Sequence, residues 1–245
     1  MKMKSKQQNI LFGVLLLIFF PLLGKASAYW MEISGGHKIG GRVTVQLIYG
    51  NIDELGVRHR QTGKELLLAA EFSFKLIDPV GKITLLHFVQ KSDCWQATFN
   101  PKNKGVYRIL GINKTHPVID RSATGGENVL PIDYLCGQYW VGLPKGKLEP
   151  AQFLDLFSKT EGNVVKIFAF KDNLPAKAKT KLRVFNPENW ERELVLDDKG
   201  EAFFLPTMKG MYVIRLDWVD PKEGTYKGTA YTSIRHRCNY CLFVE

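Results

Sequence analysis

Apolar and polar residues alternate in short runs along most of the chain beyond residue 29. These runs cover 42–49, 71–77, 83–89, 94–99 and 106–112 in the first half, and 164–170, 181–185, 191–196, 202–205, 211–218 and 225–235 in the second. A period of two is typical of half-buried β-strands. Turn clusters rich in Pro, Gly and Asn lie between the runs, so consecutive strands are expected to pair antiparallel. Helical periodicity is limited to 151–157, where we predict a helical turn.

One motif occurs twice. The pattern Pro-x-x-Lys-Gly-x-Tyr-x-Ile at 101–109 recurs at 206–214, 105 positions later. Pro and Gly form a turn, and the Tyr and Ile that follow, two residues apart, face the core from one side of a strand. A repeat of this length corresponds to one domain. We therefore predict an all-β protein of two tandem immunoglobulin-like β-sandwiches, covering residues 29–136 and 147–245.

The N-terminus has the three parts of a signal peptide. Three lysines precede an apolar run over 10–23, and the small residues 26–28 follow it. This order is typical of export signals, and the run is shorter than the ~20 residues that a membrane-spanning helix needs. We predict that residues 1–28 are removed after Ala28, leaving a periplasmic or secreted protein that starts at Tyr29.

Charge and hydropathy narrow the range of partners. The predicted signal peptide contains four lysines and no acids, so its removal lowers the net charge from +10 to +6. The remaining basic residues are scattered among acids, and no helix-turn-helix, RNA-binding or zinc-finger pattern accompanies them, so we expect no nucleic-acid partner. No later apolar stretch approaches the roughly 18 residues of a membrane span.

Four cysteines are candidates for structural chemistry: Cys94, Cys136, Cys238 and Cys241. An oxidising compartment permits disulfides, and three pairings are possible. The C-x-x-C spacing of the last two lacks both the βαβ context of a redox motif and a second C-x-x-C for zinc. We expect a structural role, either as a disulfide or as buried thiols on a last strand.

Local catalytic motifs are missing from the sequence. It contains no G-x-S-x-G, H-E-x-x-H or Walker pattern, and the glycine-rich segment 35–41 lies between two predicted strands, where a hairpin turn is expected. Two acids distant in sequence could still meet in a cleft. We predict a non-enzyme.

Two histidines stand out as candidate metal ligands. His116 precedes Pro117 and is followed four residues later by Asp120, whereas His236 lies between two arginines at the end of a predicted strand. Imidazole with carboxylate suits divalent nickel, cobalt, zinc or copper. If the protein holds a divalent transition metal, we predict His116, Asp120 and His236 as its ligands.

Several segments carry a family resemblance: the opening 29–33, the strand 40–44, the turn 78–81 and the strand 105–107. Together they resemble a widespread periplasmic domain family of unknown function, whose members are often labelled as periplasmic components of cobalt or nickel uptake systems. The resemblance spans most of the mature chain. It implies an accessory protein that presents a metal ion to a membrane component of such a system.

A second class of function fits the same sequence. Exported tandem sandwiches often bind ligands on their loops or sheet faces without catalysis. Aromatic residues that could form a stacking platform for a glycan or protein are Trp95, Tyr139, Trp140, Trp190 and Trp218. The alternative prediction is thus a glycan- or protein-binding module of the cell envelope.

Overall fold

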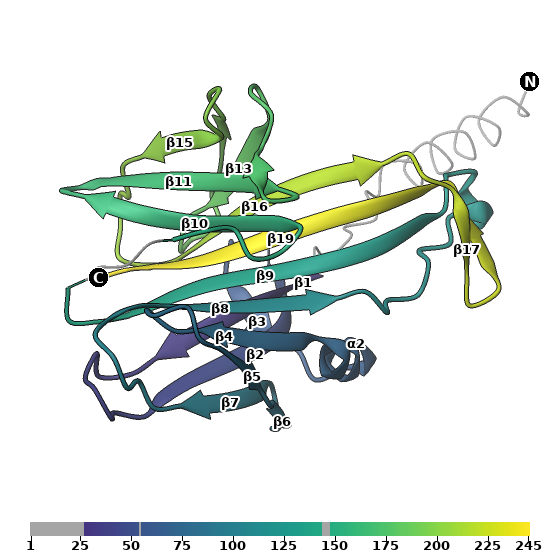
Figure 1. The fold of residues 1–245 in the computed structure, drawn as a ribbon. Helices are drawn as coiled ribbons and strands as arrows, with labels where there is room; N and C mark the ends of the chain where they lie inside the picture. The colour runs from purple at the N-terminus through teal and green to yellow at the C-terminus, as the bar shows by residue number, and fades with distance from the viewer. Residues whose placement is uncertain (1–26, 54, 144–147) are drawn as a thin grey trace, which may run out of the picture.

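The computed structural model describes residues 27–53, 55–143 and 148–245 and confirms an all-β sandwich fold (Figure 1). The predicted signal peptide lies outside these residues, except for Ser27 and Ala28 at the start of β1. Within the described residues, no helix is long and apolar enough to cross a membrane.

Each sandwich has its own outer sheet. That of the first sandwich consists of β1 (Ser27–Ser34), β2 (Val43–Ile52), β3 (Arg58–Arg60), β6 (Val89–Gln90) and β7 (Trp95–Phe99). That of the second consists of β10 (Leu154–Glu161), β11 (Val164–Lys171), β12 (Leu174–Pro175) and β15 (Glu201–Phe204). Among the described strands, β1 pairs only with β2 and β10 pairs only with β11, so each is the edge strand of its outer sheet.

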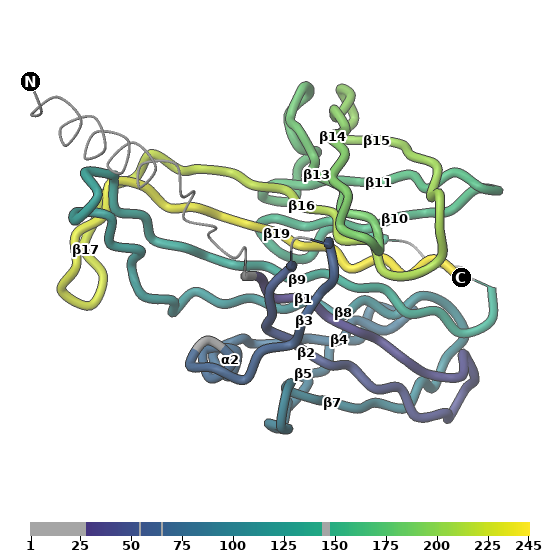
Figure 2. Tube along the Cα trace, turned by 180° about the vertical axis from the view of Figure 1, so that it is seen from behind, coloured from purple at the N-terminus to yellow at the C-terminus, as the bar shows by residue number. Residues whose placement is uncertain are grey.

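A continuous eight-stranded sheet lies between the two outer sheets and belongs to both sandwiches (Figures 1 and 2). Its order is β14 (Glu191–Val195), β13 (Lys181–Phe185), β16 (Gly210–Asp220), β19 (Ser233–Val244), β9 (Val129–Val141), β8 (Gly105–Asn113), β4 (Ser73–Ile77) and β5 (Ile83–Leu86). Smaller elements are α2 (Lys64–Leu68), the 3₁₀ turns at Ala69–Glu71 and Ser122–Thr124, and the hairpin of β17 (Gly224–Tyr226) and β18 (Thr229–Tyr231).

The sandwiches join through a parallel pairing of their last strands, β9 and β19. Successive side chains on a strand point to opposite faces, and here both faces are covered. Tyr134 and Cys136 of β9 belong to the core of the second sandwich, whereas Leu135 and Tyr139 belong to the core of the first. The two cores therefore lie on opposite faces of one sheet and share its central strands.

The repeated motif forms the same structure twice. The hydroxyl of Tyr107 accepts hydrogen bonds from the backbone N–H groups of Lys102 and Asn103, at 3.0 and 2.8 Å. The hydroxyl of Tyr212 accepts them from Thr207 and Met208, at 3.0 and 3.1 Å. This is the tyrosine corner of immunoglobulin-like sandwiches. Both rings are buried, as predicted for core-facing residues.

Three details differ from the sequence predictions. The helical turn predicted over 151–157 is wrong, because strand β10 begins at Leu154. The strand predicted over 225–235 is instead the β17–β18 hairpin followed by β19, whose twelve residues carry the last two cysteines. Strand β9 continues to Val141, beyond the residue 136 at which we ended the first sandwich, and the division into domains stays a prediction.

All four cysteines are buried free thiols in this structure. Cys136 and Cys238 lie on neighbouring strands with their Sγ atoms 3.4 Å apart. Burial raises the pKa of the Cys241 thiol to about 12, and that thiol accepts a hydrogen bond from the backbone N–H of Met31 at 3.2 Å. The thiols therefore pack as small core side chains.

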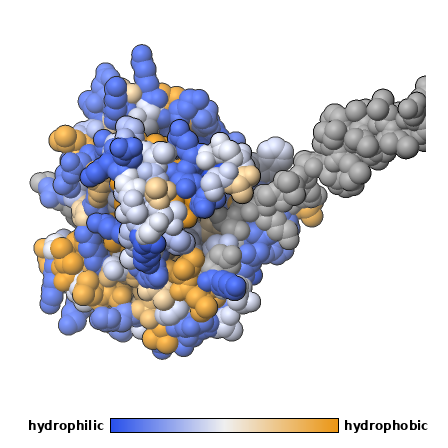
Figure 3. Space-filling model, turned by 90° about the vertical axis from the view of Figure 1, so that its right-hand side faces the viewer, coloured by the Kyte–Doolittle hydropathy of each residue, from blue (hydrophilic) through white to orange (hydrophobic). Residues whose placement is uncertain are grey.

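The surface shown in Figure 3 is mixed, with hydrophobic side chains more frequent in the lower part of the view, where the first sandwich lies. Exposed apolar residues of that sandwich include Val80, Ile83, Leu85 and Val89.

Candidate functional site: the junction pocket and the β10 cleft

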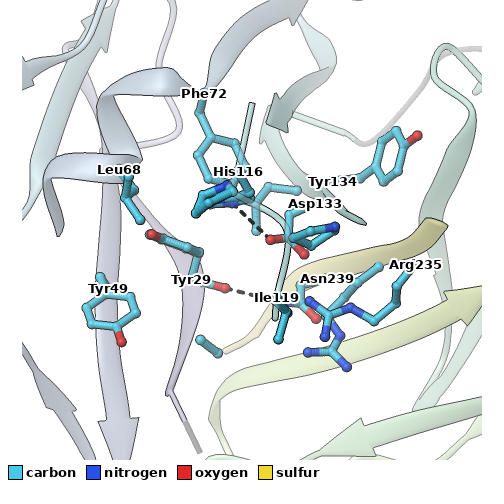
Figure 4. Close-up of a pocket in the computed structure, with 15 residues that line it drawn as sticks. Tyr29, Tyr49, Leu68, Phe72, His116, Ile119, Asp133, Tyr134, Arg235 and Asn239 are labelled. Carbon is cyan, nitrogen blue, oxygen red and sulfur yellow. Dashed lines mark hydrogen bonds and ion pairs between the residues drawn. The ribbon is translucent and has the colours of Figure 1, made fainter. Parts of the chain in front are cut away.

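A cavity of about 260 Å³ lies where β1, β9 and β19 meet, and we call it the junction pocket (Figure 4). Its apolar walls include Tyr29, Phe72, Ile119 and Leu135, and its polar groups are His116, Asp133, Arg235, Arg237 and Asn239. The side-chain amide of Asn239 donates to the backbone carbonyl of Tyr29 at 3.2 Å. The pocket thus sits between the first strand of one sandwich and the last strand of the other.

His116 is one of the predicted metal ligands, and it lies in this pocket with its side chain 7% exposed. Its Nε2 atom is 3.1 Å from Oδ2 of Asp133, an ion-pair distance, although the pair lacks the geometry of a hydrogen bond. The imidazole stacks on Tyr29, with ring centroids 5.8 Å apart, and meets the edge of Phe72. These contacts hold the ring in place.

His236 points to the other face of the shared sheet. It alternates with Arg235 and Arg237, which line the junction pocket, and therefore faces the second sandwich. There its Nδ1 lies 2.9 Å from the hydroxyl of Tyr134, and its ring packs against Phe153 and Trp218. Burial lowers the pKa of His236 to about 4, so the imidazole is neutral at pH 7.

The predicted metal ligands do not meet in one place. The sheet separates His116 from His236, and the exposed carboxylate of Asp120 accepts the backbone N–H of Ser122 at 2.9 Å in a surface turn. In the part of the chain that the structure describes, no three His, Cys, Asp or Glu side chains form a group that could hold a metal ion. A metal role for these residues stays a prediction.

A larger cavity of about 760 Å³ lies beside the free edge of β10, and we call it the β10 cleft. Its apolar lining includes Val106, Leu148, Leu205, Leu242 and Val244, and Trp140 contributes an aromatic side chain. This volume is in the range of sites that bind small molecules or short peptide segments. The cleft lies over the inner strands β8, β9 and β19, on the face that carries the second sandwich.

A polar network forms one side of the cleft. The side-chain oxygen of Gln138 accepts the backbone N–H of Ser158 at 2.7 Å, and its nitrogen donates to the Ser158 carbonyl at 3.3 Å. The hydroxyl of Tyr240 donates to the same Gln138 oxygen at 2.6 Å and lies 2.8 Å from Oγ of Ser158. The Gln138 amide therefore supplies one acceptor and one donor to β10, as a residue of a neighbouring strand would.

After Ser158, the next residue of β10 whose backbone N–H and C=O point away from β11 is Thr160. The Ser158 N–H bonds to Gln138, so Ser158 and Ile167 form a pair without hydrogen bonds between β10 and β11. Because pairs with and without hydrogen bonds alternate along an antiparallel ladder, the pair Thr160↔Val165, two residues further along, also lacks them. The N–H and C=O of Thr160 consequently point away from β11. Thr160 is exposed and lines the cleft.

Sequence reasoning did not single out Gln138, Ser158 or Thr160, because the position equivalent to Gln138 can be recognised only from the pairing of the strands. Gln138 pairs with Arg108 across β9 and β8, and Cys241 pairs with Val213, the repeat equivalent of Arg108, so Gln138 and Cys241 occupy equivalent positions. An amide in one copy at the place of a cysteine in the other marks a point where the two sandwiches diverge.

The five aromatic residues predicted as a stacking platform do not share one location. Trp140 lines the β10 cleft, Tyr139 is buried in the first core, and Trp218 packs against His236. Trp190 is 74% exposed in the turn between β13 and β14, and Trp95 packs against the core of the first sandwich.

Comparisons with known proteins identify no family. No family model matches the chain, and no curated protein matches it, so the resemblance to a cobalt- or nickel-associated family stays a prediction. Among solved structures, dimeric latent PorU from Porphyromonas gingivalis aligns at 9% identity and a TM-score of 0.21, over 86% of this chain and 20% of that chain. A marsupial T cell receptor aligns at 11% identity and a TM-score of 0.20, over 87% of this chain and 74% of that chain.

Proposed function

We propose that this chain is an exported, non-catalytic module of the cell envelope that binds an extended segment of another protein in the β10 cleft. The observation that carries the proposal is the outward-facing backbone of Thr160 beside a cavity of about 760 Å³. An unpaired strand edge is a template for another strand, and proteins use such edges to bind extended peptides.

The Gln138 amide supports a peptide as the occupant. It already provides the acceptor and donor that a neighbouring strand would give to Ser158. An added strand would continue this pairing at Thr160, with its backbone bonded to β10. Because successive side chains of a strand alternate in direction, every second side chain would enter the cleft toward Val106 and Leu205.

Export of the chain and the absence of catalysis are parts of the same proposal. Export is supported by the basic, apolar and small-residue segments at the N-terminus. Binding by strand addition needs backbone groups and apolar side-chain sites, which the cleft offers, and no nucleophile or acid–base pair. We do not include nickel or cobalt uptake, because His116 and His236 face opposite sides of the shared sheet.

Selection from a phage-displayed library of random linear heptapeptides, with the mature chain as bait, tests this function. We expect enriched peptides with alternating apolar positions, and competition among them for one site. No enrichment over blank beads would overturn the proposal. Binding to a glycan array without any peptide binding would also overturn it, in favour of a carbohydrate ligand.

A further inference from the structure

Arg235 is half-buried, and no carboxylate of the described residues forms an ion pair with it. Its Nε atom is buried, and no hydrogen-bond acceptor contacts it among the described residues. The neighbouring arginine on the same face, Arg237, pairs with Asp217 at 2.7 Å. Burial of the Nε–H group without a hydrogen-bond acceptor is costly, which points to a partner that is not part of this chain.

The charges around Arg235 limit what that partner can be. Asp133 faces the same pocket, but its carboxylate lies 3.1 Å from His116, and Asp217 is held by Arg237. Burial and then the nearby Arg237 lower the pKa of Arg235, so the surroundings offer that guanidinium too little negative charge. Because Asp133 is close, a ligand with one negative charge fits better than a dianion.

The remaining walls favour a ligand with an apolar part. In Figure 4, Asp133, Asn239 and Arg235 lie on one side of the pocket, and Tyr49 and Leu68 lie on the other. A planar guanidinium fork binds a carboxylate with two parallel hydrogen bonds. An aromatic or aliphatic body would then contact Tyr29 and Phe72.

We propose that the junction pocket binds a small organic carboxylate, with its oxygens on Arg235 and its apolar part against Tyr29 and Phe72. This site is separate from the β10 cleft, since the two cavities lie on opposite faces of the shared sheet. Loss of peptide binding in the β10 cleft would leave carboxylate binding in the junction pocket unaffected.

Calorimetric titration of the mature chain with phenylacetate, acetate and inorganic phosphate tests the site. Phenylacetate should bind most tightly, because it alone combines one carboxylate with an aromatic ring. Arg235→Gln should weaken its binding about tenfold or more, since the charge-assisted pair is lost. Arg235→Lys should weaken it less, because the charge remains without the fork.

Arg192→Gln is the matched control, since Arg192 is exposed on β14. It should bind phenylacetate like the wild type. Three outcomes would each overturn the proposal. These are failure of the wild type to bind phenylacetate, equal phenylacetate affinity of Arg235→Gln and the wild type, and tighter binding of phosphate than of phenylacetate. If Arg235→Gln does not fold, unchanged phenylacetate affinity in Arg235→Lys would overturn it instead.

Discussion

The two sandwiches are most informative where they differ, at the corner where each outer edge strand crosses the shared sheet. Val45 pairs with Ile33 and Ala97, and Ile167 pairs with Ser158 and Ala202. Ala97 and Ala202 are related by the repeat, so Ile33 of β1 is equivalent to Ser158 of β10.

The residues that contact Ile33 and Ser158 also differ between the two sandwiches. Ile33 packs against the core of the first sandwich and lies close over Gly137, where an added Cβ would come within 2.7 Å of the Cδ1 atom of Ile33. In the second sandwich, Ser158 bonds to Gln138, whose equivalent in the first sandwich is Cys241, and the cleft opens beside them. The repeated positions build the scaffold, and the departure from the repeat creates the candidate site.

The largest expected effect tests whether the tyrosine corners are equivalent. Tyr107→Ala and Tyr212→Ala should each lower the free energy of unfolding by about 3 to 5 kcal/mol, because each removes a buried ring and an acceptor for two N–H groups. Chemical denaturation followed by tryptophan fluorescence measures this loss. A loss below about 0.5 kcal/mol for either variant would show that its tyrosine is not a core residue.

A second difference between the repeats is a buried ion pair. Arg108 of β8 stands where the repeat places Val213 of β16, and it pairs with Asp155, which is fully buried and also accepts the Ala151 N–H at 2.7 Å. Asp155→Ala should cost about 3 to 5 kcal/mol, because it leaves a buried guanidinium without its partner.

The double variant Arg108→Val, Asp155→Ala is the control for this prediction. It should be more stable than Asp155→Ala alone, because no charge is then left buried. A double variant less stable than the single one would contradict the assignment of the cost to the unpaired charge.

The buried histidine predicts a pH dependence. The unfolded chain takes up a proton on His236 near pH 6.5 and the native state only near pH 4, so stability is full above pH 6.5 and falls as the pH decreases toward 4. Allowing for partial solvent access, the loss should be about 2 kcal/mol. His236→Gln should flatten this part of the stability profile, whereas an unchanged slope would assign the acid sensitivity to other groups.

The smallest expected effect on stability comes from making the polar corner of the second sandwich apolar. Gln138→Phe with Ser158→Ile replaces the polar pair by apolar side chains, and the free energy of unfolding should change by no more than about 2 kcal/mol. Peptides selected on the wild type should lose their binding, because the new side chains fill the cleft. Retained binding would place the peptide site elsewhere.

The period of two and the repeated Tyr motif were sufficient to predict the all-β fold and the two buried tyrosines. They could not predict the parallel pairing of β9 with β19, because long-range strand order leaves no local signature. The same pairing decides which face each histidine occupies, and it separates His116 from His236. Strand β10 was misread because Leu154, Leu156 and Phe157 are all buried, which obscures the alternation of a half-buried strand.

Strand addition at β10 is tested most directly by the affinity of a selected peptide for two variants at Thr160, measured by fluorescence anisotropy. Thr160→Pro removes the outward N–H but no ladder bond to β11, whereas Thr160→Ala keeps that N–H and changes only the side chain. We predict that the proline variant binds at least about tenfold more weakly than the alanine variant at similar thermal stability. Equal affinities of the two variants would contradict peptide binding through the edge of β10.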